Sequence, residues 1–103
     1  MKQTTPQSIL NHVADYFCIS ESVEILEQNN HAVCAIPRQI AMYLMKELLG
    51  FRINQIADTF RRNHSTVIRA IREVEKRMQV DERYRMTVEG IRESITEPEV
   101  KLA

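Results

Sequence analysis

Glycine, proline and cysteine are scarce in this chain, which has two glycines, three prolines and two cysteines among its 103 residues. So few turn-forming residues argue against an all-β fold. No apolar run approaches the roughly 18 residues that a membrane-spanning helix requires, and the N-terminus lacks the pattern of a secretory signal peptide. We therefore expect one soluble, cytoplasmic, all-helical domain over residues 1–103.

Patterns that bind metals or nucleotides are also missing. Cys18 and Cys34 are not spaced as a paired motif, and the three histidines form no HxxxH pair, so we expect reduced, core-type cysteines and no metal. No GxxxxGK[ST] phosphate loop occurs, and no Ser/His/Asp, Cys/His or carboxylate pair has a motif context. We expect neither a nucleotide cofactor nor enzymatic activity.

The formal net charge is zero, but the charges are segregated along the chain. Residues 1–35 carry one cation and four anions, and residues 79–103 carry four cations and six anions. Residues 36–78 between them carry nine cations and four anions. A basic middle between acidic flanks indicates a surface that faces a polyanion.

Apolar spacing predicts about six helices. Thr5 is a good N-cap and Pro6 suits the first helical position, so the first helix should run from there to about Phe17. Ser20 is positioned to cap a short second helix through Leu26.

Pro37 again suits a first helical position and predicts the start of the next helix, which Gly50 should close by taking the left-handed conformation. A last helix is predicted from about Asp81 to Ile95. Residues 97–103 should form a frayed tail.

A helix-turn-helix is predicted between about residues 53 and 78. A short helix over 53–60 is followed by a polar turn, Arg61-Arg62-Asn63, in which Asn63 can cap the next helix. At about 100° per residue, that next helix has an aliphatic stripe and an opposite polar stripe. The aliphatic stripe is Val67, Ile71, Val74 and Met78, and the polar one is Ser65, Arg69, Arg72 and Lys76.

Each part of this pattern has a purely structural alternative. Asn63 is equally suited to capping alone, and His64 by itself is typical of any exposed turn. The cations could form an ordinary solvated face, because Glu73 and Glu75 are their neighbours in sequence. Yet the outer stripe contains no anion, and Arg72 and Lys76 repel each other across one helical turn. This conflict favours a functional surface, with this helix entering the major groove of DNA.

Two sequence strings carry a resemblance to a known family. P-R-Q-I-A-M-Y-L at residues 37–44 and N-H-S-T-V at residues 63–67 closely resemble the C-terminal DNA-binding domain of the bacterial replication initiator DnaA. The resemblance implies a six-helix domain of the Trp-repressor-like helix-turn-helix group. It also implies that the domain binds a short asymmetric duplex box as a monomer.

The resemblance also implies roles for individual residues. Those expected in the major groove are Asn63, His64, Ser65 and Thr66, with Ile68 placed to touch a thymine methyl group. Those expected to hold mainly the DNA backbone are Arg38, Gln39, Lys46, Asn54 and Arg69, to which the cationic turn and outer stripe add Arg61, Arg62 and Arg72.

Three departures from the family pattern stand out. Residues 27–33, where the family has a basic loop that enters the minor groove, contain no lysine or arginine. The turn after Phe60 is one residue shorter, with Arg61 in place of the usual glycine. Asn63 replaces the common acidic residue, and an asparagine is able to pair bidentately with adenine.

The sequence leaves two functions open. The first is sequence-specific duplex DNA binding, which would regulate replication initiation or transcription and involve other proteins of those processes. Met1 and the early helix start favour a stand-alone domain over an excised one. The second is a protein–protein adaptor that kept the fold and lost strong DNA binding. The missing basic loop and the acidic flanks favour the adaptor. Met42 and Tyr43 would add to that surface if they were exposed, but such residues more often pack in the core.

Overall fold

The computed structural model of the chain describes residues 4–19, 25 and 32–96, with side chains described from residue 35 onward in the last range. These residues form helices and no strand, so the expected all-α class is confirmed. The helices are α1 (Pro6–Tyr16), α3 (Ala32–Leu49), α4 (Ile53–Phe60), α5 (His64–Val80) and α6 (Glu82–Thr96). The short second helix expected from Ser20 to Leu26 lies outside the described residues except for Ile25, which is helical. The expected frayed tail also lies outside them.

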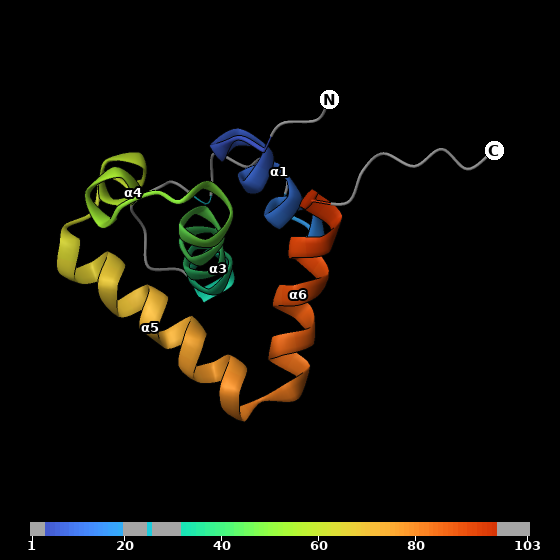
Figure 1. Cartoon of the computed structure of the whole chain (residues 1–103). Coiled ribbons are helices and arrows are strands. Elements are labelled where there is room, and N and C mark those ends of the chain that lie inside the picture. The colour runs from blue at the N-terminus through green and yellow to red at the C-terminus, as the bar shows by residue number, and fades with distance from the viewer. Residues whose placement is uncertain (1–3, 20–24, 26–31, 97–103) are drawn as a thin grey trace.

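Helix α3 is the centre of the domain, and it contacts α1, α4 and α5. Figure 1 shows α5 and α6 as two arms that meet near Asp81 and diverge on either side of α3, which is seen almost end-on. Helix α1 closes the open side by contacting both α3 and α6. The aliphatic side chains of these helices meet in one core. Its fully buried members include Ile9, Ile40, Leu44, Phe60, Val67, Val74 and Ile91.

Several helix ends lie where the sequence predicts them. The Thr5 hydroxyl accepts a hydrogen bond from the Ser8 N–H at 3.0 Å, and Pro6 is the first residue of α1. Gly50 follows α3 with φ of +68°, in the left-handed region where glycine has no steric cost. Asp81 precedes α6, and its carboxylate accepts from the Tyr84 N–H at 3.1 Å.

The prediction that the third helix begins at Pro37 is wrong, because α3 begins five residues earlier at Ala32 and contains Pro37. The first four N–H groups of any helix have no partner within it, so a proline at the sixth position removes only one hydrogen bond. Pro37 is also buried. Packing against the rest of the domain therefore offsets a local cost that would otherwise favour a start at the proline.

The prediction of a core-type Cys18 is also wrong, since its side chain is exposed. Cys18 has φ of +58°, and the next residue, Ile19, donates its N–H to the Ala14 carbonyl at 2.8 Å. This closing turn sends Ile19 into the core and leaves Cys18 outside. The side chain of Cys34 lies outside the described ones. None of the described helices is long and apolar enough to cross a bilayer.

Candidate nucleic-acid interface

The helix-turn-helix predicted for residues 53–78 is confirmed as α4, a three-residue turn and α5. Helix α4 opens with the Arg52 N–H donating to Gln55 Oε1 at 2.8 Å, and it buries Ile56, Ala57 and Phe60. It ends at Arg61, whose φ of +55° lies in the left-handed region. The position that the family fills with glycine therefore keeps a glycine-like backbone here, although an arginine occupies it.

Asn63 opens α5 as its N-cap, as the sequence predicts. Its Oδ1 atom accepts two hydrogen bonds, from the Thr66 N–H at 2.9 Å and from the Ser65 hydroxyl at 3.0 Å. These bonds hold the side chains at the tip of α5 in one arrangement. Capping and a place on the exposed tip are therefore both properties of Asn63.

Helix α5 divides into the two faces that its periodicity predicts. Val67, Ile71 and Val74 are buried, and Met78 is partly buried. On the other side, one shallow depression of about 240 Å³ is lined by Ser65, Ile68, Arg69 and Arg72. Lys76 is exposed one turn further along the helix.

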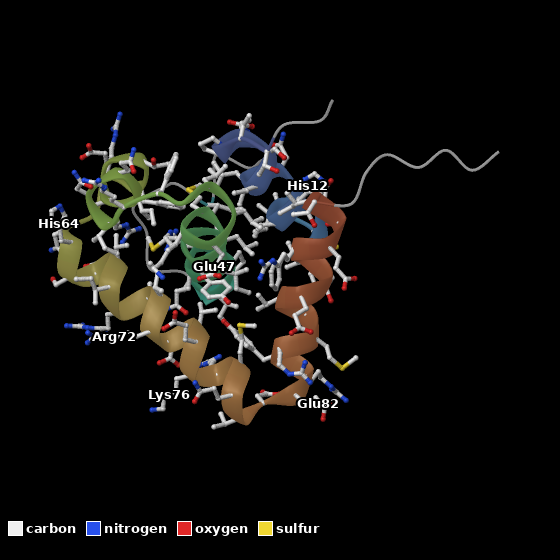
Figure 2. All side chains as sticks on the ribbon, viewed as in Figure 1. His12, Glu47, His64, Arg72, Lys76 and Glu82 are labelled. Atoms are coloured by element: carbon white, nitrogen blue, oxygen red, sulfur yellow. The ribbon has the colours of Figure 1, made fainter. Side chains whose placement is uncertain are left out.

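The outer cations of α5 are not neutralised by carboxylates. Among the described residues, Arg69, Arg72 and Lys76 form no ion pair. In Figure 2, Arg72 and Lys76 extend from the side of α5 that faces away from α3, and His64 lies at the end of α5 next to α4. By contrast, Arg77 near the other end of α5 donates to Glu73 at 2.8 Å and lies over the Tyr84 ring. The outer face thus presents positive charge to solvent.

The structure brings together the residues predicted to contact base edges. They occupy the cap and the first five residues of α5, and all are exposed, including Ile68 with 37% of its surface accessible. The set is Asn63, His64, Ser65, Thr66 and Ile68.

The residues predicted to hold the DNA backbone are in more varied surroundings. Those that are exposed are Lys46, Asn54, Arg61, Arg69 and Arg72, whereas Gln39 and Arg62 are partly buried. The Lys46 ammonium forms an ion pair with its sequence neighbour Glu47, with an Nζ to Oε2 distance of 3.8 Å. Arg38 is 6% exposed, and its Nε donates to the Ile25 carbonyl at 2.8 Å. Arg38 therefore joins the beginning of α3 to the preceding segment of the chain.

Lys76 is missing from the DNA-contacting set predicted from the sequence. Its spacing from Arg69 and Arg72 nevertheless places it on the same polar stripe of α5. Met42 and Tyr43, cited above as potentially exposed, are 1% and 9% exposed. Burial raises the pKa of the Tyr43 hydroxyl above its usual value. These two residues therefore give no support to an adaptor surface.

An all-helical domain with an α4–turn–α5 unit and a polar, cationic outer face on α5 defines the class of DNA-binding helix-turn-helix domains. The family model described as bacterial dnaA protein helix-turn-helix matches residues 6–74, and the chain belongs to this family. This family is a DNA-binding domain and not a catalytic one.

Curated relatives agree with the family assignment. The chain is 38% identical to the chromosomal replication initiator protein DnaA 2 of Protochlamydia amoebophila, over 77% of this chain and 17% of the relative. It is 35% identical to the chromosomal replication initiator protein DnaA of Geotalea daltonii, over 91% of this chain and 21% of the relative. The chain thus spans about a fifth of the length of these relatives.

Proposed function

We propose that this domain binds duplex DNA sequence-specifically, with α5 as the recognition helix. The observation that carries the proposal is the order of side-chain types along one exposed face of α5. Short hydrogen-bonding side chains occupy its N-terminal tip, and three cations without ion pairs among the described residues follow on the same side. The major groove admits one helix, whose N-terminal residues reach the base edges.

In this arrangement the tip of α5 recognises the base sequence, and the surrounding residues hold the domain on the DNA backbone. Asn63, His64, Ser65 and Thr66 face the base edges, and Ile68 supplies an apolar contact for a thymine methyl group. Phosphates on either side are held by exposed groups of α3, α4, the turn and α5. These are Lys46, Asn54, Arg61, Arg69, Arg72 and Lys76, with Gln39 and Arg62 contributing through their accessible atoms.

Arg38 has a different part in the proposal. Because its guanidinium is buried and its Nε is committed to the Ile25 carbonyl, we assign it to positioning α3 rather than to gripping a phosphate. Residues 27–33 add no cation for the minor groove. Affinity then depends on α5 and its immediate neighbours, and the domain would compete for initiator boxes or act as a small regulator of replication initiation or transcription.

A fluorescence-anisotropy titration tests the proposal with two labelled duplexes, one carrying a DnaA-type box and one of the same composition in scrambled order. With about five phosphate contacts, the logarithm of affinity should fall against the logarithm of salt concentration with a slope of about −4 to −5. His64→Ala should weaken binding to the box more than binding to the scrambled duplex, whereas Lys46→Ala should weaken both.

Two results would contradict the proposal. Absence of salt-sensitive binding below about 10 μM on either duplex would leave the adaptor function ahead, because even non-specific binding by a cationic helix lies near that range. Equal losses on both duplexes for His64→Ala would remove the base-contacting role of His64 while keeping DNA binding.

A further inference from the structure

The orientation of the Asn63 side-chain amide is fixed by its neighbours. The Thr66 backbone N–H can only donate, so the Asn63 atom 2.9 Å from it has to be the oxygen Oδ1 and not the nitrogen. The Ser65 hydroxyl, 3.0 Å from the same oxygen, therefore donates to it as well. The Thr66 N–H thus fixes which way the amide faces, and the Ser65 hydroxyl adds a second donor to the same oxygen.

These two bonds use both lone pairs of Oδ1, because a carbonyl oxygen has two acceptor sites. The Asn63 amide nitrogen remains, with two N–H donors, on an exposed residue at the tip of α5. Among the described residues it has no hydrogen-bond partner. The side chain thus presents donors alone to whatever lies in front of the helix.

We propose that Asn63 makes this domain select a keto base, guanine or thymine, at the position it faces and reject an amino base there. The proposal rests on the proposed function above. In the major groove, guanine O6 and thymine O4 are acceptors, whereas the corresponding exocyclic groups of adenine and cytosine are amino donors. A donor-only amide pairs with the keto oxygen of the first two and opposes the amino group of cytosine. Adenine offers it only N7, which lies beside an amino donor that opposes the amide.

The bidentate adenine pair that an asparagine is able to form is not open to this residue. That pair needs Oδ1 to accept from the adenine amino group while the amide nitrogen donates to N7. Here Oδ1 is already saturated by Ser65 and Thr66. The internal bonds of the cap, and not the residue type alone, set which edge Asn63 recognises.

The variant that reverses this polarity is Asn63→Asp. Aspartate caps a helix as well as asparagine and suits the positive N-terminal end, so the fold should be kept, which a thermal melt will verify. One carboxylate oxygen remains on the cap, and the other presents an acceptor in place of the donors. Selection of bound sequences from a random duplex pool should then show one position at which the preferred base pair differs between the parent protein and Asn63→Asp.

Base analogues at that position decide which group is recognised. Replacing the guanine by 2-aminopurine, or the thymine by its analogue without O4, removes the keto oxygen together with the adjacent ring N–H. The same duplexes are therefore titrated with Asn63→Ala, which separates the lost contact from the altered base pair. The parent protein should lose about two- to tenfold in affinity, the range of one neutral hydrogen bond, and Asn63→Ala should lose nothing further. Removing the amino group of the paired base should leave the affinity of the parent unchanged.

Ser65→Ala provides a second variant. It frees one lone pair of Oδ1, so adenine should become acceptable at the same position. Dependence of the parent protein on an amino group, or identical selected sites for the parent and Asn63→Asp, would overturn the proposal while leaving sequence-specific binding intact. Failure of the parent to enrich any sequence would instead reject the proposed function, and the inference with it.

Discussion

The two helices that diverge from Asp81 carry similar amounts of charge but arrange it differently. Helix α6 contains three cations and three anions, and its Arg85 lies between Glu82 at 3.6 Å and Glu89 at 3.2 Å. These anions stand three residues before and four residues after the arginine, where helical neighbours meet. The surface of α6 therefore balances its own charge.

Helix α5 has anions as well, Glu73 and Glu75, but within the described part of the chain neither forms an ion pair with its outer cations. Glu73 is bound to Arg77, and Arg69, Arg72 and Lys76 form no ion pair among the described residues. Exposed ion pairs contribute little to stability, so the arrangement on α5 costs the fold little. The comparison teaches that the position of anions relative to cations, more than the number of cations, separates the unpaired face of α5 from the self-balanced surface of α6.

The sharpest way to break this comparison is to reverse two charges on each helix in turn. Arg69→Glu with Arg72→Glu should lower DNA affinity by on the order of 100-fold, because two cationic contacts become repulsive. Arg83→Glu with Arg92→Glu on α6 makes the same change in net charge and should cost less than about threefold. Anisotropy titrations at one salt concentration measure both, and circular dichroism confirms helicity. Equal losses would mean that net charge alone drives binding.

A buried cation extends the comparison to stability. Arg38→Ala removes the guanidinium that bonds the Ile25 carbonyl, and we expect the free energy of unfolding to fall by about 2 kcal/mol. Urea denaturation measures this loss. DNA affinity of the folded protein should change by less than about threefold if Arg38 acts by positioning. An unchanged unfolding free energy together with a large loss of DNA affinity would make Arg38 a phosphate contact after all.

The smallest expected effect comes from the left-handed residue that closes α4. Arg61→Gly should raise the free energy of unfolding by about 0.5 kcal/mol, since relief of steric strain at φ +55° slightly exceeds the extra entropy of a glycine in the unfolded chain. Cys18→Gly at φ +58° is the matched control at the end of α1 and should give a similar gain. Only Arg61→Gly should also weaken DNA binding slightly. Destabilisation of both variants would show that the two turns are unstrained.

Much of the fold follows from the sequence because helical periodicity and caps are local properties. Thr5, Gly50 and Asn63 mark helix ends that the structure confirms, and the two faces of α5 follow from angular spacing alone. Pro37 was misplaced because its local preference for a helix start is overridden by burial within α3. Propensity is a weak guide where tertiary packing decides.

The candidate site was only partly predictable for the same reason. Exposure of the tip residues of α5 follows from periodicity, but the burial of Arg38 depends on its contact with Ile25, thirteen residues away in the chain. The direction of the Asn63 amide depends on two hydrogen bonds whose geometry no spacing rule supplies. The sequence does not predict contacts between distant segments, nor whether a given side chain presents a donor or an acceptor.

The turn between α4 and α5 has only three residues, and two of them are helix caps. Arg61 closes one helix and Asn63 caps the next, which leaves Arg62 as the single residue without an assignment to either end. Its backbone N–H is already bonded to the Ala57 carbonyl at 3.0 Å. One residue inserted into α5 between its Asn63 cap and Val67 would rotate the tip side chains by about 100° relative to the aliphatic stripe. The spacing between this cap and the aliphatic stripe therefore sets which side chains of α5 are buried in the core and which remain exposed.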